Sequence, residues 1–223
     1  MSRRRMMTGI GIDKHTSLLL HGDDFVDASP YKHQIINKGA IIATGKFDKG
    51  IQLGTNRYIQ IPDGFVNVDM SLDWTIDWWE NVTSNKFIPE SASILSNRIA
   101  LPLSNQQGMG IFLGYTGNSL YAGNSGAWNI FIGEKIKDTN VGTWVHWAFI
   151  KHGNQYTSYK NGKMFWSKAS SAVITKLEGD ACTIGASVSD DKIYPGYHAI
   201  VSEFRISNIA RWTSDFTPSI KPY

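Results

Sequence analysis

Short apolar segments recur about every ten residues along the chain and are separated by glycine, asparagine, aspartate and serine. They are rich in valine, isoleucine, threonine and aromatic residues, and no segment keeps the period of an amphipathic helix. Many short strands at this spacing are typical of an all-β sandwich. The pattern predicts strands at Ser17–His21, Ile41–Thr44, Ile51–Leu53, Tyr58–Ile61, Trp74–Glu80, Ser93–Ser96, Gly110–Tyr115, Ser119–Ala122, Trp128–Ile132, Trp144–Lys151, Gln155–Lys160, Lys163–Lys168, Ala181–Gly185 and Tyr197–Ile206.

The segment QYTSYKNGKMFW contains the clearest turn signal. Asn161-Gly162 lies between two strand-like runs, and these residue types accept the positive φ angles of a type I′ turn. The sequence therefore predicts a β-hairpin with a two-residue turn.

Two predicted strands are apolar on both faces, which is typical of central strands that are covered on each side. We expect Trp144, Trp147 and Phe149 to lie in the core, and we expect His146 to be structural. In WVHWAFIK one face carries Trp144, His146, Ala148 and Ile150, and the other carries Val145, Trp147, Phe149 and Lys151. In DWTIDWWE one face carries Trp74, Ile76, Trp78 and Glu80, and the other carries Asp73, Thr75, Asp77 and Trp79.

A sheet that is covered on its outer face needs a segment to cover it, and the end of the chain can do this. The closing segment 208–223 follows the last predicted strand and contains Ile209, Trp212 and Phe216, which are spaced too widely for one strand face. We expect these three side chains to hold an irregular segment across the sandwich.

The charge of the chain is concentrated at its start. The net charge is +3, and Arg3, Arg4 and Arg5 account for all of it, so the remainder is neutral. Binding of duplex nucleic acid needs basic residues gathered on a face of the domain, so we do not expect it. We expect residues 1–14 to form a flexible basic arm and residues 15–223 to form one domain.

Other classes of protein lack their signals in this sequence. We find no apolar run of about 18 residues for a membrane span, and the basic start lacks the hydrophobic region of a Sec signal peptide. Cys182 is the single cysteine, which excludes an intrachain disulfide and a thiolate zinc cluster. We expect it to be a small buried apolar residue.

Five motifs in order resemble one family. They are SLLLHGDDFVDASPYKH at 17–33, KGIQLGTNRYIQIP at 49–62, DWTIDWWE at 73–80, WVHWAFIKHGNQYTSYKNG at 144–162 and SEFRISNIARWTSDFTPS at 202–219. Together they are similar to laminin-G-like, concanavalin A-like jelly rolls of bacterial surface proteins and phage structural proteins. The resemblance implies an antiparallel two-sheet jelly-roll sandwich with the tail packed on it, and a place on a virion or an extracellular surface.

The resemblance also directs attention to calcium. In related sandwiches an acidic residue late in the chain, with oxygens from the first strand, can hold this ion, but Ser202 stands at that position here. The remaining candidate ligands for Ca²⁺ are Asp23 and Asp24, which carry the hard oxygens that this ion prefers. Asp27 and Ser29, before Pro30, are more typical of turn formers.

Catalysis is not expected, although glycoside hydrolases share this sandwich. These enzymes hold two carboxyl groups roughly 5–5.5 Å or 6.5–9.5 Å apart. Asp77 and Glu80 lie three residues apart on one predicted strand, on opposite faces and about 10 Å apart along it. The chain also has no GxSxG nucleophile elbow.

Aromatic residues are the remaining functional signal. GYTGNSLYAGNSGAW surrounds Tyr115, Tyr121 and Trp128 with glycine, asparagine and serine, and SVSDDKIYPGY adds Asp190, Asp191 and Tyr194. Flat rings beside amide and hydroxyl groups suit sugars, which makes these six residues candidate ligand contacts. The alternative is that the rings cover the edge of a sheet.

Two classes of function follow from these observations. The first is a non-catalytic, lectin-like module that binds a glycan or cell-surface polysaccharide, including one carried on a phage particle. The second is a structural virion protein that binds no specific glycan and contacts other virion proteins through its N-terminal arm. A glycoside hydrolase is the third and least favoured alternative.

Overall fold

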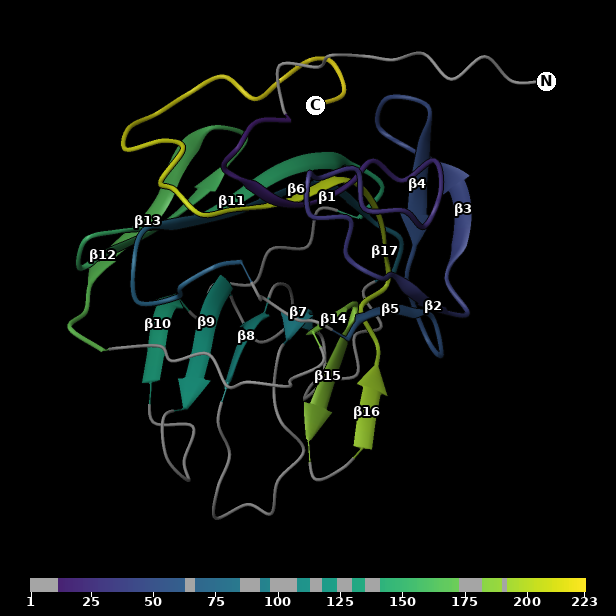
Figure 1. Cartoon of the computed structure of the whole chain (residues 1–223), viewed down its shortest axis with the longest axis horizontal. Helices are drawn as coiled ribbons and strands as arrows, with labels where there is room; N and C mark the ends of the chain where they lie inside the picture. Colours follow the sequence, from purple (N-terminus) through teal and green to yellow (C-terminus); the bar gives the residue numbers. More distant parts are fainter. Residues whose placement is uncertain are drawn as a thin grey trace.

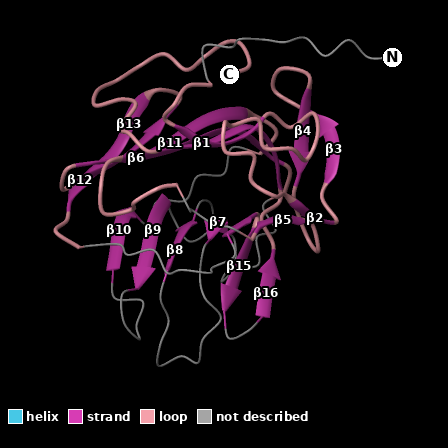
Figure 2. Ribbon diagram, in the orientation of Figure 1, coloured by secondary structure: helices cyan, strands magenta, loops and turns pink. Residues whose placement is uncertain are grey.

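The structure is a computed structural model that describes residues 12–62, 67–84, 93–96, 108–112, 118–123, 130–134, 141–172, 182–189 and 192–223. Within these ranges the chain forms strands and loops and contains no helix, so no helix there could cross a membrane. The predicted all-β class is confirmed (Figure 2). Most of the predicted 1–14 arm lies outside the described residues, and its flexibility stays a prediction.

The first sheet carries the two strands that the sequence predicts to be covered on both faces. β6 and β11 are neighbours at its centre, and β1 pairs with β17 beside the main path of the sheet. In order across the sheet the strands are β13 (Lys163–Ala169), β12 (Gln155–Lys160), β11 (Trp144–His152), β6 (Trp74–Val82), β17 (Ala199–Ser207), β4 (Lys49–Gln52) and β3 (Ile41–Thr44), with β1 at Thr16–Leu20.

The second sheet faces the first, and a separate hairpin follows it (Figure 1). All the strand pairs within the sheets and the hairpin are antiparallel, which confirms the predicted jelly-roll sandwich. The second sheet runs β10 (Ile130–Glu134), β9 (Asn118–Gly123), β8 (Gly108–Phe112), β7 (Ser93–Ser96), β14 (Cys182–Ile184), β5 (Tyr58–Ile61) and β2 (Ile36–Lys38), and the hairpin joins β15 (Ala186–Ser189) to β16 (Lys192–Pro195).

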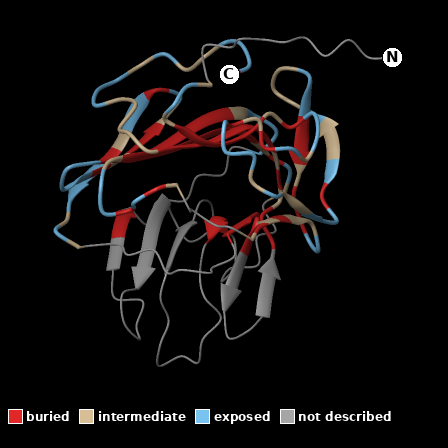
Figure 3. Cartoon of the chain, in the orientation of Figure 1, coloured by how far each residue is buried: buried red, intermediate tan, exposed pale blue. Residues whose placement is uncertain are grey.

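The main core lies between the two sheets, where buried residues line the facing surfaces (Figure 3). Trp78 of β6 packs between Phe149 of β11 and Phe204 of β17, with ring centroids 6.2 Å and 5.9 Å away. The second sheet contributes Ile59, Leu95 and other buried aliphatic residues to the same core. Each fully buried side chain of this size contributes roughly 1.5–3 kcal/mol, so this core dominates the stability of the sandwich.

Two predictions about the core have different outcomes. Trp147 and Phe149 are 1% and 2% exposed, so both lie in the core as predicted. Cys182 is fully buried, also as predicted, and this burial raises the pKa of its thiol. Trp144 is only half-buried, so its assignment to the core was wrong. It opens β11, and alternation along the strand puts it on the side of Ala148 and Ile150, the outer face, so it does not belong to the core between the sheets.

The tail covers the outer face of the first sheet, as the sequence predicts (Figure 1). A second apolar cluster forms there around Ala148, Ile150 and Tyr159, and the tail residues Trp212 and Phe216 pack against it. Ala210 joins this contact, whereas the side chain of Ile209 does not. Instead, the carbonyl oxygen of Ile209 accepts a 2.8 Å hydrogen bond from Thr75 Oγ1, so the backbone and not the side chain holds the tail at this point.

The β12–β13 hairpin has the predicted turn. Asn161 and Gly162 have φ angles of 51° and 75°, the left-handed values that a type I′ turn requires. The tail docks on this turn, because Phe216 N donates to Gly162 O at 2.8 Å. Asp215 accepts from the backbone N–H of Met164 on edge strand β13, which covers part of the exposed sheet edge.

Candidate functional site

The structure places two of the six predicted ligand residues on strands away from the tail. Tyr121 lies on β9, opposite Gly110 of β8 and Phe131 of β10, and Tyr194 lies on β16, opposite Ser187. These strands lie on the side of the molecule farthest from the tail (Figure 1). The structure does not describe the side chains of Tyr121 and Tyr194. Tyr115, Trp128, Asp190 and Asp191 lie outside the described residues altogether. The six-residue ligand site therefore stays a prediction.

The predicted cation ligands Asp23 and Asp24 are exposed in the loop that follows β1. Asp24 Oδ1 accepts a hydrogen bond from Val26 N, which is a local turn contact. Among the described residues no group of three or more His, Cys, Asp or Glu side chains could hold a metal ion. Bound calcium at this loop stays a prediction.

Asp27 is a turn former, as predicted, and it is almost completely buried. Its carboxylate accepts hydrogen bonds from the backbone N–H groups of Leu19, Ser29 and His33, and so ties the loop to β1. Ser202, at the position where the resemblance implies an acidic residue, also has a structural contact. Its hydroxyl accepts from Lys46 N and donates to Lys49 O, so it holds the β3–β4 loop against β17.

Glu80 and Asp77 lie on opposite faces of β6, as predicted. Glu80 points between the sheets, where its carboxylate accepts hydrogen bonds from Trp78 Nε1 at 3.0 Å, Trp147 Nε1 at 2.9 Å and the hydroxyl of Tyr197. Asp77 points to the outer face, under the tail. Because the sheet separates the two carboxylates, they cannot act together on one glycosidic bond.

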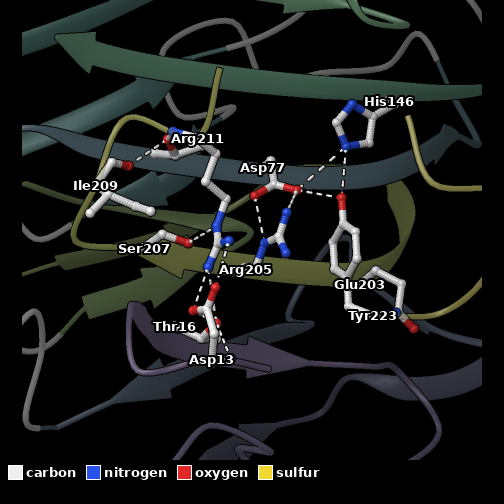
Figure 4. Close-up of polar contacts among 11 residues, drawn as sticks. Asp13, Thr16, Asp77, His146, Glu203, Arg205, Ser207, Ile209, Arg211 and Tyr223 are labelled. Atoms are coloured by element: carbon white, nitrogen blue, oxygen red, sulfur yellow. Dashed lines mark hydrogen bonds and ion pairs between the residues drawn. The ribbon is translucent and has the colours of Figure 1, made fainter. Parts of the chain in front are cut away.

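Asp77 is the centre of a buried polar cluster that joins the first sheet to the tail (Figure 4). Arg205 binds it through two hydrogen bonds, and the hydroxyl of Tyr223 donates to Asp77 Oδ2 at 2.5 Å. His146 Nε2 lies 3.1 Å from the same hydroxyl, so His146 is structural, as predicted. Burial raises the pKa of Asp77, but the positive charge of Arg205 and the hydrogen bonds from His146 and Arg205 together outweigh it and lower the pKa to about 2.

A bulge in β17 aims two charged residues at the tail. Ser202 pairs with Trp79 and Arg205 pairs with Asp77, so two residues of β17 face the single residue Trp78. Glu203 sits at this bulge with a φ of 54° and accepts a hydrogen bond from Tyr223 N at 3.0 Å. Phe204 alone separates Glu203 from Arg205, so alternation places both on the outer side of the sheet, and the extra residue lets Val201 and Phe204, three positions apart, both face the core.

A second ion pair fixes the middle of the tail. Arg211 donates to both carboxylate oxygens of Asp13, at 3.1 Å and 3.0 Å, and also to Ser207 and Thr16 (Figure 4). The hydrogen bonds from Arg211 hold the pKa of Asp13 well below its usual range. The tail is thus held at Arg211, at Phe216 and at Tyr223.

Sequence reasoning did not find Arg205, Arg211 or Tyr223. The alternation in EFRIS places an arginine on the outer face of the last strand, which was the one available signal for Arg205. Tyr223 and Arg211 lie in an irregular segment without periodicity, so nothing in the pattern shows what they contact.

A laminin-G family model, described as the concanavalin A-like lectin/glucanases superfamily, matches residues 53–215. The chain belongs to this superfamily. The match includes the strands from β5 to β17 and the tail up to Asp215. No curated protein matches the sequence.

Solved structures share the concanavalin A-like fold at low sequence identity. Domain 4 of AbnA, a GH43 extracellular arabinanase from Geobacillus stearothermophilus, in complex with arabinotriose, has a TM-score of 0.67 at 18% identity, covering 88% of this chain and 93% of that domain. The binding domain of Paraclostridial Mosquitocidal Protein 1 has a TM-score of 0.66 at 16% identity, covering 88% of this chain and 49% of that one. The binding domain of Botulinum Neurotoxin DC, in complex with SialylT, has a TM-score of 0.62 at 12% identity, covering 88% and 48%. The chain thus spans about half the length of the two toxin structures.

Proposed function

We propose that this protein is a non-catalytic carbohydrate-recognition module. The observation that carries the proposal is the match to domain 4 of the arabinanase, which was solved with arabinotriose and is covered over almost its whole length. The neurotoxin binding domain, solved with SialylT, also supports recognition of a sugar. All three matching structures are named as domains, and the two toxin structures are named as binding domains.

The arrangement of carboxylates supports binding over hydrolysis. The two carboxylates of β6 lie on opposite faces, and each is occupied by buried hydrogen-bond donors: indole and phenol groups at Glu80, and a guanidinium and a phenol at Asp77. A hydrolase needs one proton donor and one carboxylate on either side of the same bond. Among the described residues this arrangement does not exist on β6.

We propose Tyr115, Tyr121, Trp128, Asp190, Asp191 and Tyr194 as the glycan contacts; of these, Tyr121 lies on β9 of the second sheet and Tyr194 on β16 of the hairpin. The tail already covers the outer face of the first sheet, which leaves less of that face for a glycan and supports contacts elsewhere. The strands β9 and β16 lie on the opposite side, where the tail does not compete for contact with a ligand. Aromatic rings among small polar residues provide stacking surfaces for sugar rings.

A glycan array with the full chain tests the proposal, followed by calorimetry with each glycan that binds. Tyr121→Ala together with Trp128→Ala should weaken binding at least about tenfold, the usual effect of losing aromatic anchors. Tyr31→Ala, which removes an exposed ring near β1, is the matched control and should keep full affinity. Absence of binding across neutral, acidic and arabinose-containing glycans, or release of reducing ends from a bound glycan, would contradict the proposal.

The setting of the protein stays a prediction. The named neighbours come from toxins and from an extracellular arabinanase, and they lend no support to a phage particle or to virion partners for the N-terminal arm. We propose an extracellular or virion surface because a glycan-binding module needs access to polysaccharide. Calcium binding at Asp23 and Asp24 can be tested in the same calorimetry by adding EDTA.

A further inference from the structure

A cavity of about 420 Å³ lies between the tail and the outer face of the first sheet. Arg205 of β17 lines it from the sheet, and Arg211, Trp212 and Tyr223 line it from the tail. Its volume falls within the range of small-molecule pockets, roughly 300–1,000 Å³. The tail, which supplies most of the lining, lies on the opposite side of the sandwich from β9 and β16 (Figure 1).

The charged groups that line this cavity have one sign. The charged side chains among its lining residues are those of Arg205 and Arg211, and no Asp or Glu among the described residues lines it. The partner carboxylates, Asp77 and Asp13, bind the two guanidinium groups from outside the lining (Figure 4). Each ion pair is therefore a dipole with its positive end toward the cavity, which favours an anionic group inside it.

The two arginines are held in place before any ligand arrives. Arg205 is 3% exposed, its guanidinium carbon lies 3.6 Å above the centroid of the Tyr223 ring, and it donates twice to Asp77. Arg211 is fixed by Asp13, Ser207 and Thr16. Because these contacts have already restricted both side chains, a ligand would lose little affinity in ordering them.

The remaining lining suits a hydroxylated ring. Trp212 stacks one face on Phe216, with centroids 3.9 Å apart and ring planes within 4°. The guanidinium carbon of Arg205 lies 5.8 Å from the centroid of Trp212, at the outer limit of a cation–π contact, and 3.6 Å from that of Tyr223. Thr217 and Ser219 add hydroxyl-bearing side chains to the same cavity; the Ser219 hydroxyl already donates to Lys221 O, so it can only accept from a sugar hydroxyl.

We propose that this cavity is a second ligand site, which binds a carboxylate-bearing sugar such as the uronic acid unit of an acidic polysaccharide. The positive ends of the two ion pairs select the carboxylate, and the aromatic and hydroxyl groups hold the ring. The site is separate from the glycan contacts proposed on the second sheet, so either proposal can fail without the other.

Calorimetry of the full chain with methyl β-glucuronide and methyl β-glucoside tests the selectivity, because these probes differ only in a carboxylate or a hydroxymethyl group. The glucuronide should bind at least about tenfold more tightly, the ratio expected for a hydrogen bond to a charged group. Equal affinity for the two probes, or no detectable binding of the glucuronide, would overturn the inference.

Two variants at one ion pair should have opposite effects. Arg211→Gln removes a positive group from the lining and should weaken glucuronide binding about tenfold, whereas Asp13→Asn removes the compensating carboxylate and should strengthen it. If both variants weaken binding, Arg211 acts only by holding the tail and does not bind the carboxylate of the probe, which would overturn the inference. Thermal melting of each variant shows whether the fold is kept.

The position at which the glucuronide binds can be tested without those variants. In a nitrogen-15 spectrum, the indole signal that a Trp212→Phe variant lacks belongs to Trp212, and it should shift when the glucuronide is added to the unmodified chain. Tyr121→Ala should bind the glucuronide as the unmodified chain does. Loss of binding in Tyr121→Ala, or an unshifted Trp212 signal, would place the probe on the second sheet and overturn the inference.

Discussion

Asp77 and Arg205 are directly opposed on neighbouring strands β6 and β17 and form a bidentate ion pair, with distances of 2.9 Å and 3.1 Å. Both side chains are at most 3% exposed, so water screens the pair very little. Tyr223 adds its hydroxyl to the same carboxylate and its ring to the guanidinium face, and thereby connects the end of the tail to the middle of the sheet.

Asp77→Asn should destabilise the domain by about 3–5 kcal/mol, because it leaves the buried guanidinium without its counter-charge. Asp73→Asn is the matched control: this carboxylate precedes the same strand but its side chain is 38% exposed, so its loss should cost at most about 1 kcal/mol. Urea titration of both variants measures the difference. Equal costs would show that the Asp77 pair contributes no more than a surface contact.

Stability should fall in acid because of the same carboxylate. The pKa of Asp77 is lowered to about 2 in the folded protein, against an ordinary value near 3.9 when unfolded. Its contribution is therefore complete above about pH 4 and is lost as the pH falls through 2, a change of roughly 2–3 kcal/mol. Asp77→Asn should have a flatter dependence of unfolding free energy on pH between 4 and 2. Parallel curves for the two proteins would contradict this assignment.

The sequence predicts the scaffold well where side chains alternate regularly. The strands at 41–44, 58–61, 93–96 and 155–160 have their predicted bounds, because each is a short run of β-forming residues between turn residues. The strand β2 and the β15–β16 hairpin were missed, since INK is only three residues long and the alternation in ASVS includes only two apolar residues. Their pairing is decided by the strands beside them, which a local pattern does not contain.

The polar cluster under the tail could not be predicted for a similar reason. Asp77 and Arg205 are 128 residues apart in sequence, and the bulge at Glu203 that sets their register leaves no mark in the alternation of EFRIS. The predicted ligand residues were chosen from local composition alone. Local composition shows that Tyr121 has small polar neighbours, but it does not show which other loop meets it.

Trp147 and Trp144 provide a test of how the core is distributed along β11. Trp147→Ala should cost roughly 3–5 kcal/mol, because the ring is 1% exposed and its Nε1 donates to Glu80 in the core. Trp144→Ala, three residues earlier on the same strand, removes a half-buried ring and should cost less than half as much. Denaturant titration measures both values. A larger loss for Trp144 would show that the outer face of the sheet, and not the core between the sheets, is the more tightly packed.

Gly162 and Gly153 form a matched pair that tests the docking of the tail. Both have left-handed φ angles, 75° and 57°, so an alanine at either site pays a strain of about 1–2 kcal/mol. At Gly153 an added Cβ meets no atom within 4 Å, whereas at Gly162 it would lie 1.9 Å from the carbonyl oxygen of Phe216. The tail must therefore move away in Gly162→Ala but not in Gly153→Ala.

Gly162→Ala should thus cost roughly 2 kcal/mol more than Gly153→Ala, because it also loses the hydrogen bond from Phe216 N and part of the burial of the Phe216 ring. Trypsin provides a second measurement, since displacement of the tail should expose the peptide bond after Arg211 and speed its cleavage. Asp215, which holds the neighbouring edge strand, would move with the same segment. Equal stability and equal cleavage rates for the two variants would mean that the turn does not anchor the tail, and that Arg211 and Tyr223 suffice to keep it on the sheet.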